Sequence, residues 1–331
     1  MINKNSRILI TGGKGFLGRY VERELRRQDY SNVFTASGVT DGLDLGEEAN
    51  VGWLFDYTKP DYVVHLACRH GGMGANFRYS GGLMYENLNM SIKIIEEARQ
   101  YDVKKIVNAC DISCYPARCP MPFRETDFWE GYPHFSKGHY SIAKKTIADM
   151  LVAYKRQFGM NTLSLIFSDI YGPEDEFDPH AGKIIPALLT NVRFALENDL
   201  KDFNVDGSSK STRDFIYVED CAKAVVLALE NDVDANILNI GSGEETTIKD
   251  LVSTVCDSAN YMGKIEWNET KAKGVERRCL DITGARQLLS FEPQTKLKDG
   301  IDKTLDWFYK AMQSPAQYAP DELPPSLRAL R

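Results

Sequence analysis

The chain has 331 residues, 43% of them hydrophobic, which is enough to bury a sizeable core in one large domain or two lobes. A formal net charge of −7 gives no reason to expect a nucleic-acid backbone or an anionic membrane as a partner, so any anionic ligand has to be held by local basic clusters. No stretch approaches the roughly 18 apolar residues of a membrane span, and the polar residues 1–6 do not resemble a secretory signal. We therefore expect a cytoplasmic protein.

The cysteines point to the same compartment. Seven is an odd number, and their scatter along the chain favours reduced thiols over a disulfide framework. Cys110, Cys114 and Cys119 lie close together and are followed by His134 and His139, so a zinc site has to be considered. No CxxC pair is present and the surrounding sequence is apolar, so we expect buried thiols and no metal.

The first half of the chain alternates strand and helix patterns. An apolar run at residues 7–11 ends in glycines and is followed by a helical stripe of Leu17, Val21 and Leu25. Further strands are predicted at residues 33–36, 62–67, 105–110 and 163–167, and helices at residues 83–101 and 136–158. Near-continuous apolar strands separated by helices indicate an α/β fold with a doubly wound parallel sheet, covered on both faces.

The alternation weakens after Pro173. Pro179, Gly182, Pro186 and Gly207 mark loops around a predicted helix at residues 184–198, where a second, smaller α/β lobe begins. Residues 214–230 predict a strand that returns to the sheet and then a helix, and residues 236–240 predict another strand. The proline-rich segment after Gln313 has little apolar periodicity and is predicted to be flexible.

Residues 11–18 read TGGKGFLG, with glycines at a GxxGxxG spacing between a predicted strand and a predicted helix. A pyrophosphate has to approach the main chain closely and bind free amides at the helix N-terminus, which bulky side chains would prevent. The spacing alone is a weak signal in a chain with 25 glycines, but its position favours a dinucleotide loop over a tight turn in a non-binding sheet. The candidate cofactor-binding residues are Gly12, Lys14, Gly15, Phe16, Leu17 and Gly18.

The end of the second strand bears on the choice of dinucleotide. An acid there usually binds the ribose hydroxyls of NAD, whereas a basic group accommodates the extra phosphate of NADP. The strand ends Thr35-Ala36-Ser37 without an acid, and Lys14 could reach a 2′-phosphate, although it also fits a solvated surface lysine. We therefore favour NADP slightly over NAD. The predicted cofactor site is completed by Ser37, Asp44, Leu45, Leu66, Ala67, Tyr140 and Lys144.

Tyr140 and Lys144 lie four residues apart, on one face of a predicted helix. Hydride transfer at a carbinol carbon requires a proton to move on the oxygen, and a tyrosine with its usual pKa near 10 is a poor base at neutral pH. A neighbouring ammonium favours the phenolate and can also bind the nicotinamide ribose. Tyr101 and Lys105 have the same spacing but bridge a helix end and a strand start, so we discard that pair.

The sequence resembles the extended short-chain dehydrogenase/reductase family over nearly its whole length. Within that family it is most similar to the GDP-fucose synthase branch, on residues 71–76, 184–189, 213–215 and 271–281. The motifs that carry the family resemblance are, in chain order, the glycine loop, His65-Leu66-Ala67, Asn87, the Tyr140/Lys144 pair and Tyr171-Gly172-Pro173.

The resemblance implies a Rossmann-type fold. A dinucleotide-binding domain would comprise residues 1–172 and 213–240, and a nucleotide-sugar-binding lobe residues 173–212 and 241–313, followed by a flexible tail at residues 314–331. It also implies NAD(P) as cofactor, a nucleotide-sugar as substrate, and a homodimer paired through the helices at residues 83–101 and 136–158. Arg213 and Arg277 would bind the nucleotide diphosphate from two sides. The implied substrate-binding residues are Gly72, Met73, Asn76, Asp169, Lys183, Arg213 and Arg277.

Several positions depart from the family pattern. Asp111 stands where the family has the Ser or Thr that binds the substrate oxygen, and Ser113 and Lys183 stand where GDP-fucose synthases have their epimerising cysteine and histidine. A serine hydroxyl is far less acidic than a thiol and a lysine normally stays protonated, so we expect no strong 3,5-epimerase activity. Ile112-Ser113 replaces the Asp-Glu pair of the sugar dehydratases, which argues against 4,6-dehydration.

Two of the departures introduce carboxylates. An ionised Asp111 near Tyr140 would raise the pKa of the phenol, so we expect Asp111 to be protonated, to pair with a cation, or to point away while Ser113 supplies the hydroxyl. Asp169, where relatives mostly have asparagine, adds a carboxylate near the expected diphosphate.

We therefore predict an NAD(P)-dependent oxidoreductase acting at C4 of a nucleotide-sugar, with GDP-hexose or GDP-heptose favoured. Tyr140 would be the general acid/base, Lys144 its partner and ribose ligand, and Ser113 or Asp111 the ligand of the substrate oxygen, with Lys183 facing the sugar. One alternative is a C4 or 3,5-epimerase of nucleotide-sugars. Another, motivated by the two carboxylates, is a non-catalytic NAD(P)-binding sensor.

Overall fold

The computed structural model describes residues 2–38, 42–177, 183–271 and 274–313. Six parallel strands form the central sheet in the order β10-β5-β4-β3-β1-β2. Their bounds are β1 Ile8–Thr11, β2 Val33–Ala36, β3 Tyr62–His65, β4 Lys105–Asp111, β5 Asn161–Phe167 and β10 Ile237–Ile240. The predicted doubly wound parallel sheet is confirmed, and the strand at residues 33–36 is found with the predicted bounds.

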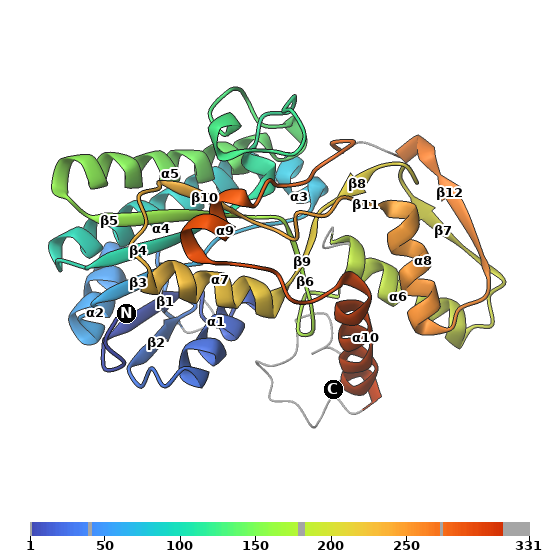
Figure 1. Cartoon of the computed structure of the whole chain (residues 1–331), viewed down its shortest axis with the longest axis horizontal. Coiled ribbons are helices and arrows are strands. Elements are labelled where there is room, and N and C mark those ends of the chain that lie inside the picture. The colour runs from blue at the N-terminus through green and yellow to red at the C-terminus, as the bar shows by residue number, and fades with distance from the viewer. Residues whose placement is uncertain (1, 39–41, 178–182, 272–273, 314–331) are drawn as a thin grey trace.

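Helices cover both faces of this sheet (Figure 1). Ile8 and Ile10 of β1 pack toward α1 and α7, while Leu9 packs in a separate cluster with the helices of the opposite face, as the alternation of side chains along a strand requires. Both faces are therefore apolar and buried. The covering helices are α1 Phe16–Arg27 and α7 Val218–Glu230 on one face, and α2 Glu48–Thr58, α4 Ser80–Gln100 and α5 Gly138–Phe158 on the other.

The chain leaves β1 for β2 at the edge of the sheet and then returns to the other side of β1 as β3. The strand order thus reverses between β1 and β3. Ligands of open α/β sheets bind at such a switch point, beyond the carboxyl ends of the strands. Here those ends carry Thr11, which leads into the glycine loop, and His65, whose ring contacts the Thr11 hydroxyl at 2.7 Å.

A second apolar cluster lies apart from the sheet. Phe177 stacks on Phe308 with ring centroids 4.5 Å apart, and both are almost fully buried. Figure 1 shows the helices of this lobe beside the sheet. Its elements are α6 Ile184–Glu197, α8 Ile248–Ala259 and α10 Leu297–Gln313, with the paired strands β7 Asp202–Asp206 and β12 Lys264–Asn268 and the short pair β8 Thr212–Arg213 and β11 Thr246–Thr247.

One strand prediction was wrong. The strand after Asp214 does not return to the central sheet, because β9 Phe215–Tyr217 pairs only with β6 Asp169–Tyr171, in a separate two-stranded sheet. The helix that follows it, α7, does pack on the central sheet. Two further helices are short, α3 Met73–Arg78 and α9 Thr283–Leu289. Pro179, Gly182 and the predicted tail at residues 314–331 lie outside the described residues, and the predicted division into two domains stays a prediction.

Candidate active site

The glycine loop has the geometry of a pyrophosphate cradle. Gly12 adopts a φ of +75°, and a Cβ there would lie 2.7 Å from the main-chain nitrogen of Ala67, so only glycine allows the loop to press against the end of β3. Gly15 caps α1 without a side-chain hydrogen bond, and the first turn of α1 contains no acid. The amides at this helix N-terminus therefore favour an anion. These residues fit the phosphates of a dinucleotide.

The end of β2 lies beside this loop. The main-chain N–H of Lys14 donates to the Ser37 hydroxyl over 2.6 Å, which brings together the two residues expected near a ribose 2′-phosphate. Asp44 instead accepts the N–H of Gly46 at 2.8 Å and so closes its own turn, and Leu45 is buried in the core. Neither Ala36 nor Ser37 is an acid, and among the described residues that follow them Asp44 does not offer a free carboxylate for ribose hydroxyls.

Tyr140 and Lys144 lie near the start of α5 and are both buried, at 7% and 2% exposure. The Lys144 ammonium donates to the main-chain oxygen of Ala109 over 3.1 Å, which holds it against the last residues of β4. Burial, and after it the charges of Cys68 and Asp111, raise the pKa of Tyr140 well above its ordinary value. Burial therefore outweighs the effect that we expected from Lys144, and the phenol is protonated at neutral pH.

Asp111 pairs with a cation, which is one of the three arrangements expected from the sequence. Its carboxylate accepts the main-chain N–H of Ser113 at 2.7 Å and lies 3.9 Å from the ammonium of Lys137. Burial alone would raise the pKa of Asp111, but Lys137 and the two hydrogen bonds from Ser113 outweigh it and hold the pKa below the ordinary value. The Ser113 hydroxyl shares a 3.0 Å hydrogen bond with that of Ser141.

The loop between β3 and α3 supplies the next predicted residues. Gly72 caps α3, and Met73 is its first residue, with a side chain outside the described part of the chain. Asn76 donates to the main-chain oxygens of Gly71 and Gly72 at 2.8 and 3.1 Å, so its amide group holds the shape of this loop.

The structure brings Arg278, not Arg277, beside Arg213. Asp169 lies 3.2 Å from Arg278 and 4.0 Å from Arg213, and both arginine side chains are only 16% exposed. Burial, followed by repulsion from Arg278, lowers the pKa of Arg213 to about 10. Arg277 points to Glu245, with which it forms two hydrogen bonds of 2.6 and 2.7 Å at the surface.

Lys183 forms an ion pair with Asp175, a fully buried residue whose pKa is raised by burial although Lys183 opposes the shift. The same ammonium lies 4.7 Å from the ring centroid of Phe16, the first residue of α1. The lysine predicted to face the sugar thus also contacts the glycine loop.

His70 was missed by the sequence analysis, since a single histidine in a loop carries no spacing signal. Burial, followed by Lys183 and Lys137, lowers its pKa to about 4, although more than a third of its surface is open to water. The charged groups that affect this pKa include Lys183, Asp111 and Lys144, so His70 lies near the predicted site residues. At neutral pH His70 is an uncharged donor and acceptor.

The cysteine cluster shows no metal geometry. Cys110 and Cys114 are buried free thiols, as predicted, whereas Cys119 is a free thiol that is only partly buried. Within residues 2–38, 42–177, 183–271 and 274–313, no three or more His, Cys, Asp or Glu side chains are arranged to hold a metal ion. Over the same residues, none of the helices is both long and apolar enough to cross a membrane.

The fold and site define a nicotinamide-dependent enzyme, and comparison with known proteins agrees. A model of the NAD dependent epimerase/dehydratase family matches residues 8–241, and the chain belongs to this family. It is therefore an enzyme that uses NAD(P), which removes the ground for a non-catalytic sensor.

Individual relatives are similar over almost the whole chain. GDP-L-fucose synthase 1 of Arabidopsis thaliana is 31% identical, over 94% of this chain and 95% of its own. A GDP-L-fucose synthase of Sinorhizobium fredii is 32% identical, over 91% and 95% respectively. The crystal structure of a GDP-L-fucose synthetase from Naegleria fowleri bound to NADP matches with a TM-score of 0.86 at 26% identity, covering 95% of this chain and 96% of that one.

Proposed function

We propose that the protein is an NADP-dependent oxidoreductase that acts at C4 of the sugar in a GDP-hexose or GDP-heptose, without strong 3,5-epimerase activity. The GDP-sugar is suggested by the names of the similar synthases, and NADP by the Naegleria structure. The absence of an acid at the end of β2 and the contact between Lys14 and Ser37 support NADP.

The proposal that epimerase activity is weak rests on the residue types at positions 113 and 183 and on the contacts that Ser113 and Lys183 make. Epimerisation at C3 and C5 needs an acid and a base that exchange protons with the carbons beside a ketone. Ser113 instead shares a hydroxyl hydrogen bond with Ser141, and Lys183 forms an ion pair with buried Asp175. Tyr140 and Lys144 remain for redox chemistry at the end of β4.

A protonated Tyr140 is the form that reduction of a 4-ketone requires. When bound, NADPH supplies the hydride. Tyr140, protonated because burial raises its pKa, would donate the proton that the new alcohol requires. Lys144 would bind the nicotinamide ribose and stabilise the phenolate left behind. Because ionised Asp111 can only accept hydrogen bonds, Ser113 is the better donor to a ketone oxygen.

The test is to incubate the protein with NADPH and GDP-4-keto-sugars in D₂O and to follow nicotinamide absorbance. We expect oxidation of NADPH and a product that retains protium at C3 and C5 by NMR and mass spectrometry. Deuterium at those carbons would contradict the lack of epimerase activity. In a parallel incubation with the parent 4-hydroxy GDP-sugars, formation of the C4 epimer without net use of the nicotinamide would identify a C4 epimerase instead.

We also propose a homodimer paired through α4 and α5. Tyr85 and Ile92 on α4 and Phe158 at the end of α5 are exposed large apolar side chains, at 68%, 46% and 44%. A second copy would cover them. Light scattering after gel filtration tests this proposal, and the cytoplasmic location stays a prediction.

A further inference from the structure

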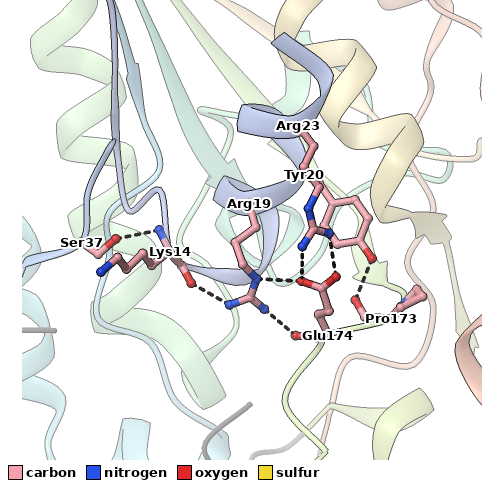
Figure 2. A network of polar contacts seen from close by, with 7 residues as sticks. All are labelled: Lys14, Arg19, Tyr20, Arg23, Ser37, Pro173 and Glu174. Carbon is pink, nitrogen blue, oxygen red and sulfur yellow. Dashed lines mark hydrogen bonds and ion pairs between the residues drawn. The ribbon is translucent and has the colours of Figure 1, made fainter. Parts of the chain in front are cut away.

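The guanidinium of Arg19, on the first turns of α1, connects two loops that are far apart in the sequence (Figure 2). Its Nη1 donates to the main-chain oxygen of Lys14 in the glycine loop at 2.8 Å. Its Nε donates to the Glu174 carboxylate and its Nη2 to the Glu174 main-chain oxygen, both at 2.9 Å. All three nitrogens therefore help to join the glycine loop to the loop that enters the second lobe.

Glu174 is held from several sides. Arg23 forms a two-pronged pair with its carboxylate at 2.6 and 3.0 Å, and Tyr20 donates to the oxygen of neighbouring Pro173 at 3.0 Å. The residue has a φ of +66°, a conformation that a non-glycine residue adopts only when its surroundings fix it. It is 9% exposed. These contacts define a rigid loop rather than a surface ion pair.

Asp175, the residue after Glu174, takes part in a second connection between the same two parts of the chain. Asp175 binds Lys183, and the Lys183 ammonium lies over the ring of Phe16, which follows the glycine loop directly. The glycine loop thus contacts the second lobe twice, through Arg19 and through Phe16.

We propose that Arg19 and Glu174 are positioning residues that hold the glycine loop in its cofactor-binding shape against the loop carrying Asp175. The inference rests on the dinucleotide site of the proposed function. Neither residue needs to touch the cofactor, because Arg19 acts through the Lys14 main chain.

Two substitutions distinguish a role in positioning the glycine loop from simple electrostatic attraction between these side chains and the phosphates of NADPH. Glu174→Gln removes a negative charge near an anionic ligand, so charge attraction alone predicts tighter binding of NADPH, whereas loss of positioning predicts weaker binding. Arg19→Lys keeps the positive charge but cannot reach three acceptors in one plane. Charge attraction predicts no change for it, and positioning again predicts weaker binding.

The experiment measures the Kd of NADPH by fluorescence titration for the wild type, both single variants and the double variant. We expect each single variant to weaken binding about tenfold, and the double variant to be no weaker than either one, because both act through one contact. Glu22→Gln, which breaks the exposed Glu22–Arg26 pair of 2.9 Å on the same helix, is the matched control and should bind normally. Melting temperatures establish that all variants are folded.

Unchanged or tighter binding by the folded Glu174→Gln variant, or normal binding by Arg19→Lys, would overturn the inference alone. Failure of the wild-type protein to bind NADPH would overturn the proposed function, and the inference with it.

Discussion

The carboxylate of Asp169 is shared by two arginines, with Arg278 at 3.2 Å and Arg213 at 4.0 Å. Two partly buried guanidinium groups therefore face this one carboxylate. Nε of Arg278 is buried without a hydrogen-bond partner among the described residues. Arg278 therefore keeps a donor that no described residue accepts, at the point where a nucleotide diphosphate is expected.

Arg278→Gln should weaken binding of GDP by about ten- to a hundredfold, because a charge-assisted hydrogen bond contributes about 1.5–3 kcal/mol. Arg277→Gln should have a much smaller effect, since Glu245 already holds that guanidinium at the surface. Isothermal titration calorimetry measures both. Arg286→Gln, which breaks the exposed pair with Glu292, is the matched control. Equal losses for Arg277→Gln and Arg278→Gln would show that the diphosphate is bound by Arg277 after all.

Asp169→Asn should tighten GDP binding several-fold. The substitution removes the charge that competes with the diphosphate for both arginines, while an amide oxygen can still accept a hydrogen bond from Arg278. The same calorimetric titration, repeated at two salt concentrations, checks this, because the gain should shrink as salt screens the charges. Weaker binding would mean that Asp169 is needed to hold the arginines in place.

Tyr140→Phe should lower kcat by about 10²–10⁴-fold, because the proton donor is lost. The Kd of NADPH should be nearly unchanged. Tyr101→Phe is the control with the same spacing to a lysine. The Tyr101 hydroxyl donates to Asp56 at the surface, at 2.6 Å, and is remote from the site. Full activity of Tyr140→Phe in single-turnover measurements would remove the catalytic assignment.

His65 should make stability depend on pH below neutrality. Burial, with a smaller contribution from Lys144, lowers its pKa to about 3 in the folded chain, against about 6.5 when unfolded. The unfolded state therefore binds the extra proton between these values, and the free energy of unfolding falls as pH falls through that window. The slope is at most about 1.4 kcal/mol per pH unit for one proton.

His65→Gln should reduce that slope by about one proton. Its stability at neutral pH will also be lower, because the contacts of His65 with Thr11 and Ser91 are disturbed, so the slope and not the absolute value is the readout. Urea denaturation at several pH values between 5 and 7 measures it. An unchanged slope would mean that other groups cause the acid sensitivity.

Phe308→Ala should lower the free energy of unfolding by about 3–5 kcal/mol, as expected when a buried aromatic ring is removed and leaves a cavity. Phe308 is 1% exposed and stacks on Phe177. Phe194→Ala on α6, where the ring is 59% exposed, should change stability by less than about 0.5 kcal/mol. Equal effects in denaturant titrations would place the main core of this lobe elsewhere.

The fold was predictable where local pattern and burial agree. The run from Ile8 to Thr11, the glycines after it and the stripe on α1 all follow from a parallel strand that is buried on both faces. The strand after Asp214 was predicted but its partner was not, because strand pairing depends on distant segments. α10 was not predicted, although its apolar face is buried against α8 and β9.

The site was predictable in its types of residue but not in their geometry. Arg277 and Arg278 are consecutive in an extended segment, where neighbouring side chains point to opposite sides. If the pairing of this segment shifted by one residue, the other arginine would face Arg213. The register is set by an isolated β-bridge between Thr212 and Arg277, which the sequence does not reveal. Likewise, the partner of Asp111 could be expected to be a cation, but only the structure identifies it as Lys137.

The apolar cluster of the second lobe is assembled from three separate stretches of chain, which contribute Phe177, Leu251 and Phe308 among others. Between the first and second stretches the chain goes back to the central sheet as α7 and β10, and between the second and third α9 packs against that sheet. Recombination between two such genes at a single crossover would therefore join half of one core to half of another. Exchange of sugar preference within this family should proceed by point substitutions or paired crossovers, rather than by the swap of one contiguous block.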